Sequence, residues 1–220
     1  MWNNILFDLD GTLTDPKIGI TRSVQFALRH YGINVENLDE LCSFIGPPLL
    51  ESFKKHYSFD DQKAKKAISK YREYFSSKGI YENSVYDGVF QMLSDLKSRG
   101  KIIILATSKP TVFAESILSH FGIKEFFDFI GGSNLNGSRS EKAEVIEYTV
   151  QKCNIDDFSS SVMIGDREYD IFGAKKVGMT SVGVLYGYGS YKELKDARAD
   201  KLISSIKDLH DFLICEKTNG

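Results

Sequence analysis

The sequence predicts an α/β protein with a doubly wound parallel sheet and a separate all-helical insert. Two observations support the sheet: short apolar runs recur along the chain, and stretches with helical periodicity lie between them. A third supports the insert, because one long segment after the first apolar run shows helical periodicity and no strand-like run. Strands that alternate with helices form a parallel sheet covered on both faces.

The apolar runs are not alternating, which is typical of strands buried on both faces. The expected strands are Ile5–Phe7, Lys101–Ala106, Phe127–Ile130, Ser161–Ile164 and Ser181–Leu185. Glycine just beyond the last periodic residue is a common helix stop, and it follows three of the four stretches between these runs. The expected helices are Val89–Ser98, Thr111–Phe121, Glu141–Cys153 and Tyr169–Val177. The pattern corresponds to a Rossmann-like core.

The insert covers residues 16–80, where apolar side chains recur at helical spacing. We therefore expect two domains. Residues 1–15 and 81–220 form the α/β core domain, and residues 16–80 form a helical cap domain.

Composition narrows the possible partners. The formal net charge is −2, so the chain lacks the basic excess that nucleic-acid polymers attract. No apolar run is long enough to span a membrane, and the first residues do not resemble a signal peptide. The three cysteines are widely spaced and are expected to be reduced thiols. We expect a cytoplasmic protein that is a monomer or a weak homodimer.

Ligands of a doubly wound sheet bind beyond the carboxyl ends of its strands, so the residues at those ends are the functional candidates. The first strand is followed by Asp8 and Asp10, and the second by Thr107 and Ser108. The later ends contribute Lys142, Asp166 and Asp170.

Asp8 and Asp10 would repel each other unless a cation or a shared proton lies between them. A calcium-binding loop does not fit, since its glycine and terminal glutamate positions are occupied by other residues in both registers. An Asx-type turn explains only one of the two aspartates. With Asp166 and Asp170, the set favours a hard divalent cation, most simply Mg²⁺.

A basic side chain in the first turn of a helix is disfavoured by the helix dipole, so Lys142 suggests a bound anion. Ser138 and Glu141 fit a capping box for the same helix. Thr107 and Ser108 precede another helix, whose free N–H groups can also bind an anion. A solvated lysine and an ordinary N-cap remain open alternatives at these positions.

The sequence motifs that are typical of dinucleotide binding and of serine hydrolases are absent.

Four motifs in this order resemble those of the haloacid dehalogenase superfamily, and the resemblance covers nearly the whole chain. They are DLDGT at 8–12, LATSKP at 105–110, Lys142 within RSEKAEVI, and MIGDREYD at 163–170. The insert after the first motif resembles the small cap of the phosphoglycolate phosphatase-like branch. The segment GGSNLNGSRSEKAEVI is similar to bacterial proteins described as 5′-nucleotidase-like.

The resemblance implies a phosphatase. Asp8 would be the nucleophile that forms an aspartyl-phosphate, and Asp10 the general acid and base. Asp8, Asp10 (through its backbone carbonyl), Asp166 and Asp170 would form the Mg²⁺ site, with Asp170 binding a metal water or orienting Asp166. The aspartate at position 10 argues for phosphoryl transfer over haloacid dehalogenation.

The resemblance also implies that Lys142 is a catalytic residue that clamps the phosphate. Substrate contacts are expected from Thr107, Ser108, Gly11 and Thr12, and from the insert. The insert residues expected to contribute are Gly46 and Pro47.

A small phosphomonoester is the expected substrate, with phosphoglycolate and nucleoside 5′-monophosphates as the two candidates. Two other functions remain open. A phosphomutase of a sugar phosphate shares the nucleophile and the acid, and a non-catalytic relative would bind phosphate without turnover.

Overall fold

The computed structural model describes residues 2–215, and these residues divide into two compact units. The core unit comprises the residues up to Thr14 together with those from Val85 onward. The helical unit is Asp15–Ser84. Where the chain passes from one to the other, β2 (Thr14–Asp15) and β3 (Ser84–Val85) pair as a two-stranded sheet. We had expected the boundaries one residue later and four residues earlier, respectively.

The core unit contains a six-stranded sheet in the order β5-β4-β1-β6-β7-β8, in which every pair of neighbours is parallel. Its strands are β1 (Asn4–Phe7), β4 (Ile102–Pro110), β5 (Phe129–Ser133), β6 (Ser161–Gly165), β7 (Thr180–Val184) and β8 (Lys201–Ile203). The chain runs outward from β1 through β4 to β5, then returns to the other side of β1 at β6. The strand order therefore reverses between β1 and β6, which is where ligands bind in such sheets. The predicted fold class is confirmed.

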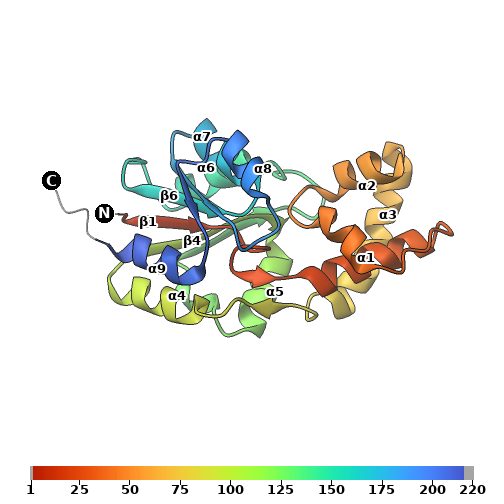
Figure 1. Ribbon diagram of the computed structural model, residues 1–220, viewed down its shortest axis with the longest axis horizontal. Coiled ribbons are helices and arrows are strands. Elements are labelled where there is room, and N and C mark those ends of the chain that lie inside the picture. Colours follow the sequence, from red (N-terminus) through yellow and green to blue (C-terminus); the bar gives the residue numbers. More distant parts are fainter. Residues whose placement is uncertain (1, 216–220) are drawn as a thin grey trace. The chain divides into compact units, whose positions relative to one another are not determined.

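Helices cover both faces of this sheet (Figure 1). One face carries α6 (Lys142–Lys152), α7 (Glu168–Lys176) and α8 (Tyr191–Asp196). The other carries α4 (Val89–Ser98), α5 (Thr111–His120) and α9 (Ile206–Ile214). A short 3₁₀ helix, η3 (Lys124–Phe126), leads toward β5. Within residues 2–215, no helix is long and apolar enough to cross a membrane.

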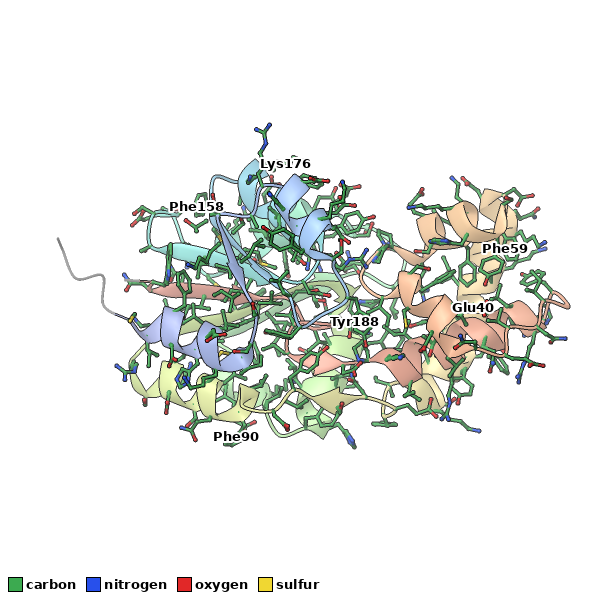
Figure 2. The ribbon with its side chains drawn as sticks, in the orientation of Figure 1. Glu40, Phe59, Phe90, Phe158, Lys176 and Tyr188 are labelled. Carbon is green, nitrogen blue, oxygen red and sulfur yellow. The ribbon has the colours of Figure 1, made fainter. Side chains whose placement is uncertain are left out.

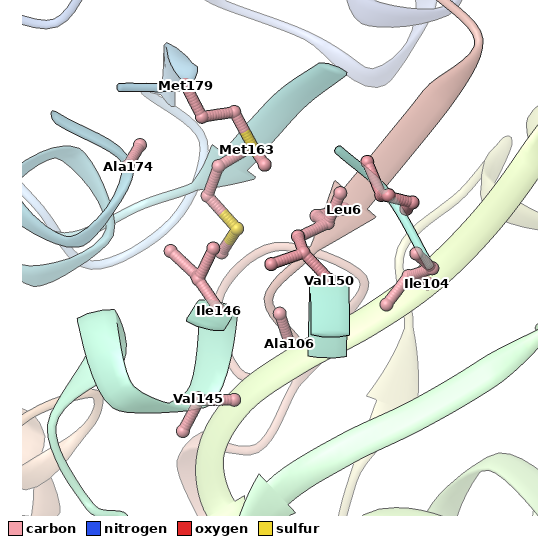
Figure 3. Close-up of a cluster of buried hydrophobic side chains, with 10 residues drawn as sticks. Leu6, Ile104, Ala106, Val145, Ile146, Val150, Met163, Ala174 and Met179 are labelled. Carbon is pink, nitrogen blue, oxygen red and sulfur yellow. The ribbon is translucent and has the colours of Figure 1, made fainter. Parts of the chain in front are cut away.

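Apolar side chains between the sheet and helix α6 fix the place of that helix. Leu6 on β1, Ile104 on β4 and Met163 on β6 form one buried cluster with Val145 and Ile146 of α6 (Figure 3). All five side chains are fully buried. Because these contacts hold α6 against three strands, they also fix the position of Lys142 at its first turn.

The helical unit consists of α1 (Lys17–Arg29), η1 (Leu38–Phe44), α2 (Leu49–Tyr57), α3 (Asp61–Tyr74) and a π-helical turn η2 (Phe75–Gly79). Its interior includes several aromatic rings. Phe53 stacks on Phe59 with ring centroids 5.9 Å apart and meets Phe44 edge-on at 5.0 Å (Phe59 is labelled in Figure 2). Such ring pairs stabilise a small helical unit beyond the area that they bury.

Several expected boundaries differ from the structure. Strand β4 continues to Pro110 instead of ending at Ala106. Strand β5 continues through Gly131 and Gly132, which had suggested a strand end. A Cβ atom on Gly131 would lie 2.0 Å from the Thr149 methyl group, so glycine is required there by close packing.

The predicted capping box at Ser138 and Glu141 is wrong. Glu141 occupies the N-cap position of α6 and its side chain makes no capping hydrogen bond. The Ser138 hydroxyl instead donates to Asn136 Oδ1 and accepts from Asn134 Nδ2. Local hydrogen bonding within the preceding turn therefore competes successfully with the helix end.

Candidate active site

Two aspartates follow the two strands at which the sheet order reverses. Asp8 comes directly after β1, and its backbone N–H donates to the Ile164 carbonyl of β6 at 2.9 Å. Asp166 comes directly after β6. Both residues are buried, because neighbouring strands and the helices above them exclude water from this edge. Parallel pairing of β1 with β6 thus brings the two carboxylates together.

Lys142 and Asp170 complete this buried group from two neighbouring helices. Nζ of Lys142 lies 2.8 Å from Oδ1 of Asp8 and 2.7 Å from Oδ1 of Asp170, and it donates to the Ala106 carbonyl at 3.0 Å. The number of these contacts equals the number of N–H donors on an ammonium group. Helices α6 and α7 pack closely enough that a Cβ on Gly173 would lie 2.8 Å from Lys142 Cγ. The packing of α6 against α7 therefore places Lys142, in the first turn of α6, in contact with Asp8 and Asp170.

Burial and the proximity of like charges raise the pKa values of Asp166 and Asp170. Burial raises the pKa of Asp170 to about 6; Lys142 lowers it and the Asp8 charge raises it further. Burial, with the charges of Asp170 and Asp8, holds the pKa of Asp166 well above its usual range. Burial disfavours the charged form of Lys142, but the charges of Asp170 and Asp8 outweigh it and raise the pKa of the ammonium group. Lys142 therefore stays protonated, and the burial of the carboxylates near it costs free energy.

Asp10 has a different partner from Asp8. Oδ2 of Asp10 lies 2.6 Å from Nζ of Lys109, at the end of β4. Burial raises the pKa of Asp10, and the ion pair with Lys109 opposes that shift without cancelling it. The two aspartates of the first motif are therefore placed in different electrostatic surroundings, as a nucleophile and a proton donor require.

Backbone packed around Asp166 fixes its position. Oδ2 accepts the Tyr188 N–H at 2.8 Å, and Oδ1 accepts the Thr12 hydroxyl at 3.4 Å (Tyr188 is labelled in Figure 2). Gly11, at φ +82°, lies so close that a Cβ would meet Oδ2 at 2.3 Å; a Cβ on Gly187 would lie 2.4 Å from Asp166 Cβ. Two glycines and a backbone amide thus enclose this carboxylate.

The two residues that follow Asp166 are bonded to Glu193 on α8. Oε1 of Glu193 accepts from Arg167 Nε at 2.8 Å and from the Glu168 N–H at 3.1 Å. Ser190 caps the same helix by accepting the Glu193 N–H at 3.0 Å. The two residues that follow Asp166 are therefore held by the helix that begins just beyond the Tyr188 loop.

Thr107 lies in the carboxyl-terminal half of β4, is buried, and accepts the Lys109 N–H on its hydroxyl at 3.3 Å. Ser108 beside it is half-buried. Gly46 and Pro47 belong to the helical unit, between η1 and α2. Of the predicted substrate contacts, Gly11 and Thr12 touch Asp166 directly.

The donor set fits a divalent cation. Asp8, Asp166 and Asp170 are all buried, and one carboxylate oxygen from each lies within 4.8 Å of the others. Together with Asp10 they supply four carboxylates against the ammonium groups of Lys109 and Lys142. When all four acids are ionised, the group carries two negative charges in excess, and oxygen ligands of this kind suit Mg²⁺. The Asp10 carboxylate is not part of the three-acid cluster.

Sequence reasoning missed Lys109, Glu193 and the Tyr188 backbone amide. Lys109 stands within LATSKP, but a strand was expected to end before it, so the residue was treated as part of a loop. Glu193 resembles any acid on a surface helix, and a backbone amide carries no signal in the sequence. Each became visible only through the contact that it makes.

A doubly wound sheet with buried carboxylates and a lysine at its reversal point defines an enzyme core suited to a metal ion and an anion. The chain matches the family model described as haloacid dehalogenase-like hydrolase over residues 5–184. The protein belongs to this family, as the motifs had predicted.

A 5′-nucleotidase of Pseudomonas aeruginosa is 48% identical over 192 residues, which cover 87% of this chain and 86% of the relative. A crystal structure described as a predicted phosphatase from Clostridium acetobutylicum matches 97% of this chain and 99% of its own, with TM-score 0.94 and 49% identity. These relatives bear out the prediction of a phosphoric monoester hydrolase of this family.

A relative with a different name is tyrosine-protein kinase PtkA of Mycobacterium tuberculosis. It is 38% identical over 185 residues, which cover 84% of this chain and 62% of the kinase. A PtkA structure matches with TM-score 0.84 and 34% identity, covering 97% of this chain and 98% of that one.

Proposed function

We propose that the protein is a Mg²⁺-dependent phosphatase that hydrolyses a small phosphomonoester through an aspartyl-phosphate on Asp8. The observation that carries the proposal is the buried group of Asp8, Asp166 and Asp170, two of which pair with Lys142. Asp8 stands where the sheet order reverses, in contact with a cation. A carboxylate in such surroundings can attack phosphorus, as in other enzymes that form aspartyl-phosphates.

Asp8, Asp166 and the main-chain carbonyl of Asp10 would hold the Mg²⁺ ion, with Asp170 beside them. When bound, the ion would neutralise charge on the phosphoryl oxygens and on the carboxylates. Three buried carboxylates, with one oxygen of each within 4.8 Å of the others, face the single ammonium group of Lys142, and this supports a divalent ion in this place. The backbone around Asp166 supports a preformed ligand, because it leaves that side chain little room to move.

The side chains of Asp8 and Asp10 divide the chemistry. Asp8 attacks phosphorus, the ester P–O bond breaks, and Asp10 donates its proton to the departing alkoxide. In the second step Asp10 accepts a proton from water as the water oxygen attacks phosphorus and releases the Asp8 carboxylate. The raised pKa of Asp10 supports its role as the acid that carries the proton into the first step.

Lys142, Thr107 and Ser108 would hold the phosphoryl oxygens. An ammonium group already in contact with Asp8 needs no rearrangement to meet negative charge on the group that Asp8 attacks. Thr107 is buried in the carboxyl-terminal half of β4, the strand next to β1. A preformed positive charge beside Asp8 supports binding of the phosphoryl group as an anion.

We infer that the substrate is a nucleoside 5′-monophosphate in preference to phosphoglycolate. The support is the 48% identity, over most of both chains, to a relative named 5′-nucleotidase. Residues 15–84 would then act as a cap domain, with Gly46 and Pro47 contacting the substrate.

We further propose that the protein works in the cytoplasm on this small molecule, as a monomer or a weak homodimer.

The test is kcat/KM for purified protein with Mg²⁺ on a panel of nucleoside 5′-monophosphates, phosphoglycolate and sugar phosphates. We expect turnover that EDTA abolishes and Asp8→Asn reduces by at least ~10³-fold, with nucleotides preferred. Preference for phosphoglycolate would overturn the substrate assignment only. Isomerisation of a sugar phosphate without release of phosphate would instead identify a mutase. Nucleotide-dependent stabilisation without any turnover would identify a binding protein.

A further inference from the structure

Lys109 is a buried cation at the active site to which the proposed phosphatase chemistry assigns no role. Its side chain is 6% exposed, and Nζ lies 2.6 Å from Oδ2 of Asp10. Two features hold its backbone at this place. The Lys109 N–H donates to the Thr107 hydroxyl, and a Cβ on Gly132 would lie 2.5 Å from the Lys109 carbonyl oxygen. Strand pairing between β4 and β5 also shifts register between Ala106 and Pro110, as is common next to active sites.

The two oxygens of Asp10 are in unlike surroundings. Oδ2 is paired with Lys109, whereas Oδ1 is buried and accepts no hydrogen bond from the residues that the structure describes. A buried carboxylate oxygen without a partner is costly, so such an atom in a native site calls for an explanation. The ion pair with Lys109 therefore restrains Oδ2 of Asp10 and leaves Oδ1 available to another group.

We propose that Lys109 is the positioning residue for the proton donor: it holds Oδ2 of Asp10 so that Oδ1 carries the proton to the leaving alkoxide. This inference rests on the proposed phosphatase function. As the ester P–O bond breaks, the proton moves from Oδ1 to the alkoxide oxygen and Asp10 is left as a carboxylate. The Lys109 ammonium is already in contact with that carboxylate and stabilises the charge as it develops.

The distinguishing property of this role is its dependence on the leaving group. An alkyl phosphate, such as a nucleoside 5′-monophosphate, expels a basic alkoxide that needs a proton. An aryl phosphate, such as p-nitrophenyl phosphate, expels a weakly basic phenolate that does not. Loss of a structural lysine would slow both esters alike, whereas loss of help to Asp10 would slow the alkyl ester selectively.

The experiment compares kcat/KM for the two esters in Lys109→Met, Lys109→Arg, Asp10→Asn and the double variant Asp10→Asn/Lys109→Met. The matched control is Lys97→Met, which breaks another lysine–aspartate pair, to Asp128, whose other oxygen is bonded to the Ile103 N–H near the start of β4. Thermal unfolding of each variant verifies the fold, and the double variant removes both charges of the buried pair.

We expect Lys109→Met to lower kcat/KM for the nucleotide by ~10²-fold and for the aryl phosphate by less than ~3-fold, within the range of general acid catalysis. Asp10→Asn should show the same selectivity, the double variant should lose no more than Asp10→Asn alone, and Lys109→Arg should restore most of the rate. Equal losses on both esters, losses that add in the double variant, or a Lys109→Met enzyme as fast as Lys97→Met would each overturn the inference. If Asp8→Asn is as active as the unaltered protein, the proposed function itself is wrong.

Discussion

Nζ of Lys142 lies 2.8 Å from Oδ1 of Asp8, with the lysine on the first turn of α6 and the aspartate at the end of β1. The dipole of α6 disfavours a positive charge at that position, and the sequence alone left a solvated lysine as an equal alternative. The pairing with Asp8 and Asp170 excludes the solvated lysine, because the side chain is buried and both acids lie within 3 Å of the ammonium group.

Replacing Lys142 with methionine should abolish most activity and weaken the fold in the absence of metal. The variant leaves Asp8 and Asp170 buried without their shared cation, and a group that stabilises transition-state charge typically contributes ~10²–10³-fold to kcat. Steady-state kinetics and thermal unfolding measure the two effects. Lys152→Met, at an exposed position of the same helix, is the control and should change neither. Full activity in Lys142→Met would contradict the role of the lysine.

The effect of Mg²⁺ on stability should depend strongly on pH. The pKa of Asp170 is raised to about 6, so the folded protein without metal binds this proton more tightly than the unfolded chain does. The stability that this bound proton contributes is therefore lost as the pH rises from ~4 to about 6. Metal binding requires deprotonated carboxylates, so Mg²⁺ competes with the proton below about pH 6 and not above it.

We accordingly expect the rise in Tm caused by Mg²⁺ to be larger at pH 8 than at pH 5, as measured by differential scanning fluorimetry. Asp166→Asn serves as the control and should show little response to Mg²⁺ at either pH. A rise of the same size at both pH values would mean that the buried acids do not form the metal site.

Glu193 should influence metal affinity from outside the metal site. Glu193 lies in the first turn of α8, the helix that follows the Tyr188 loop. Its carboxylate accepts from Arg167 and from the Glu168 N–H, the two residues directly after Asp166. Groups that orient metal ligands commonly contribute 10–100-fold to affinity. We expect Glu193→Ala to weaken the Kd for Mg²⁺ by ~10-fold while kcat at saturating Mg²⁺ changes little.

Asp196→Ala is the matched control for Glu193, because it removes an acid from the same helix that pairs only with exposed Lys192 among the described ion pairs. Its Kd for Mg²⁺ should equal that of the unaltered protein. An unchanged Kd in Glu193→Ala, measured by titration calorimetry, would show that the loop holds Asp166 without this anchor.

The sequence predicted the parts of the fold that depend on continuous patterns. Apolar runs such as Ser161–Ile164 located the strands within a few residues, and because carboxyl ends of parallel strands share one edge, Asp8 and Asp166 could be expected to meet. The edge strand β8 was not predicted, since its three residues form no apolar run. The helical unit was expected from its periodicity, and Phe53 of that pattern packs against Phe44 inside the unit.

The remaining parts of the site depend on contacts between residues distant in sequence. Lys109 reaches Asp10 because β4 continues beyond its apolar run, and no local pattern indicates this. Gly187 is required by the close approach of Asp166, which only the folded chain reveals. The capping box at Ser138 and Glu141 was wrong because the preceding turn satisfies its own polar groups.

The central claim is that Asp8 is the nucleophile, and the most direct measurement is the site of phosphorylation during turnover. Protein mixed with Mg²⁺ and a nucleoside 5′-monophosphate is quenched with acid within one turnover, digested, and examined by mass spectrometry. We predict a phosphoryl group on the peptide that contains Asp8, assigned to that residue by fragmentation and absent from Asp8→Asn. Hydrolysis in which no phosphoprotein forms, or in which the phosphoryl group is found on another residue, would contradict the account.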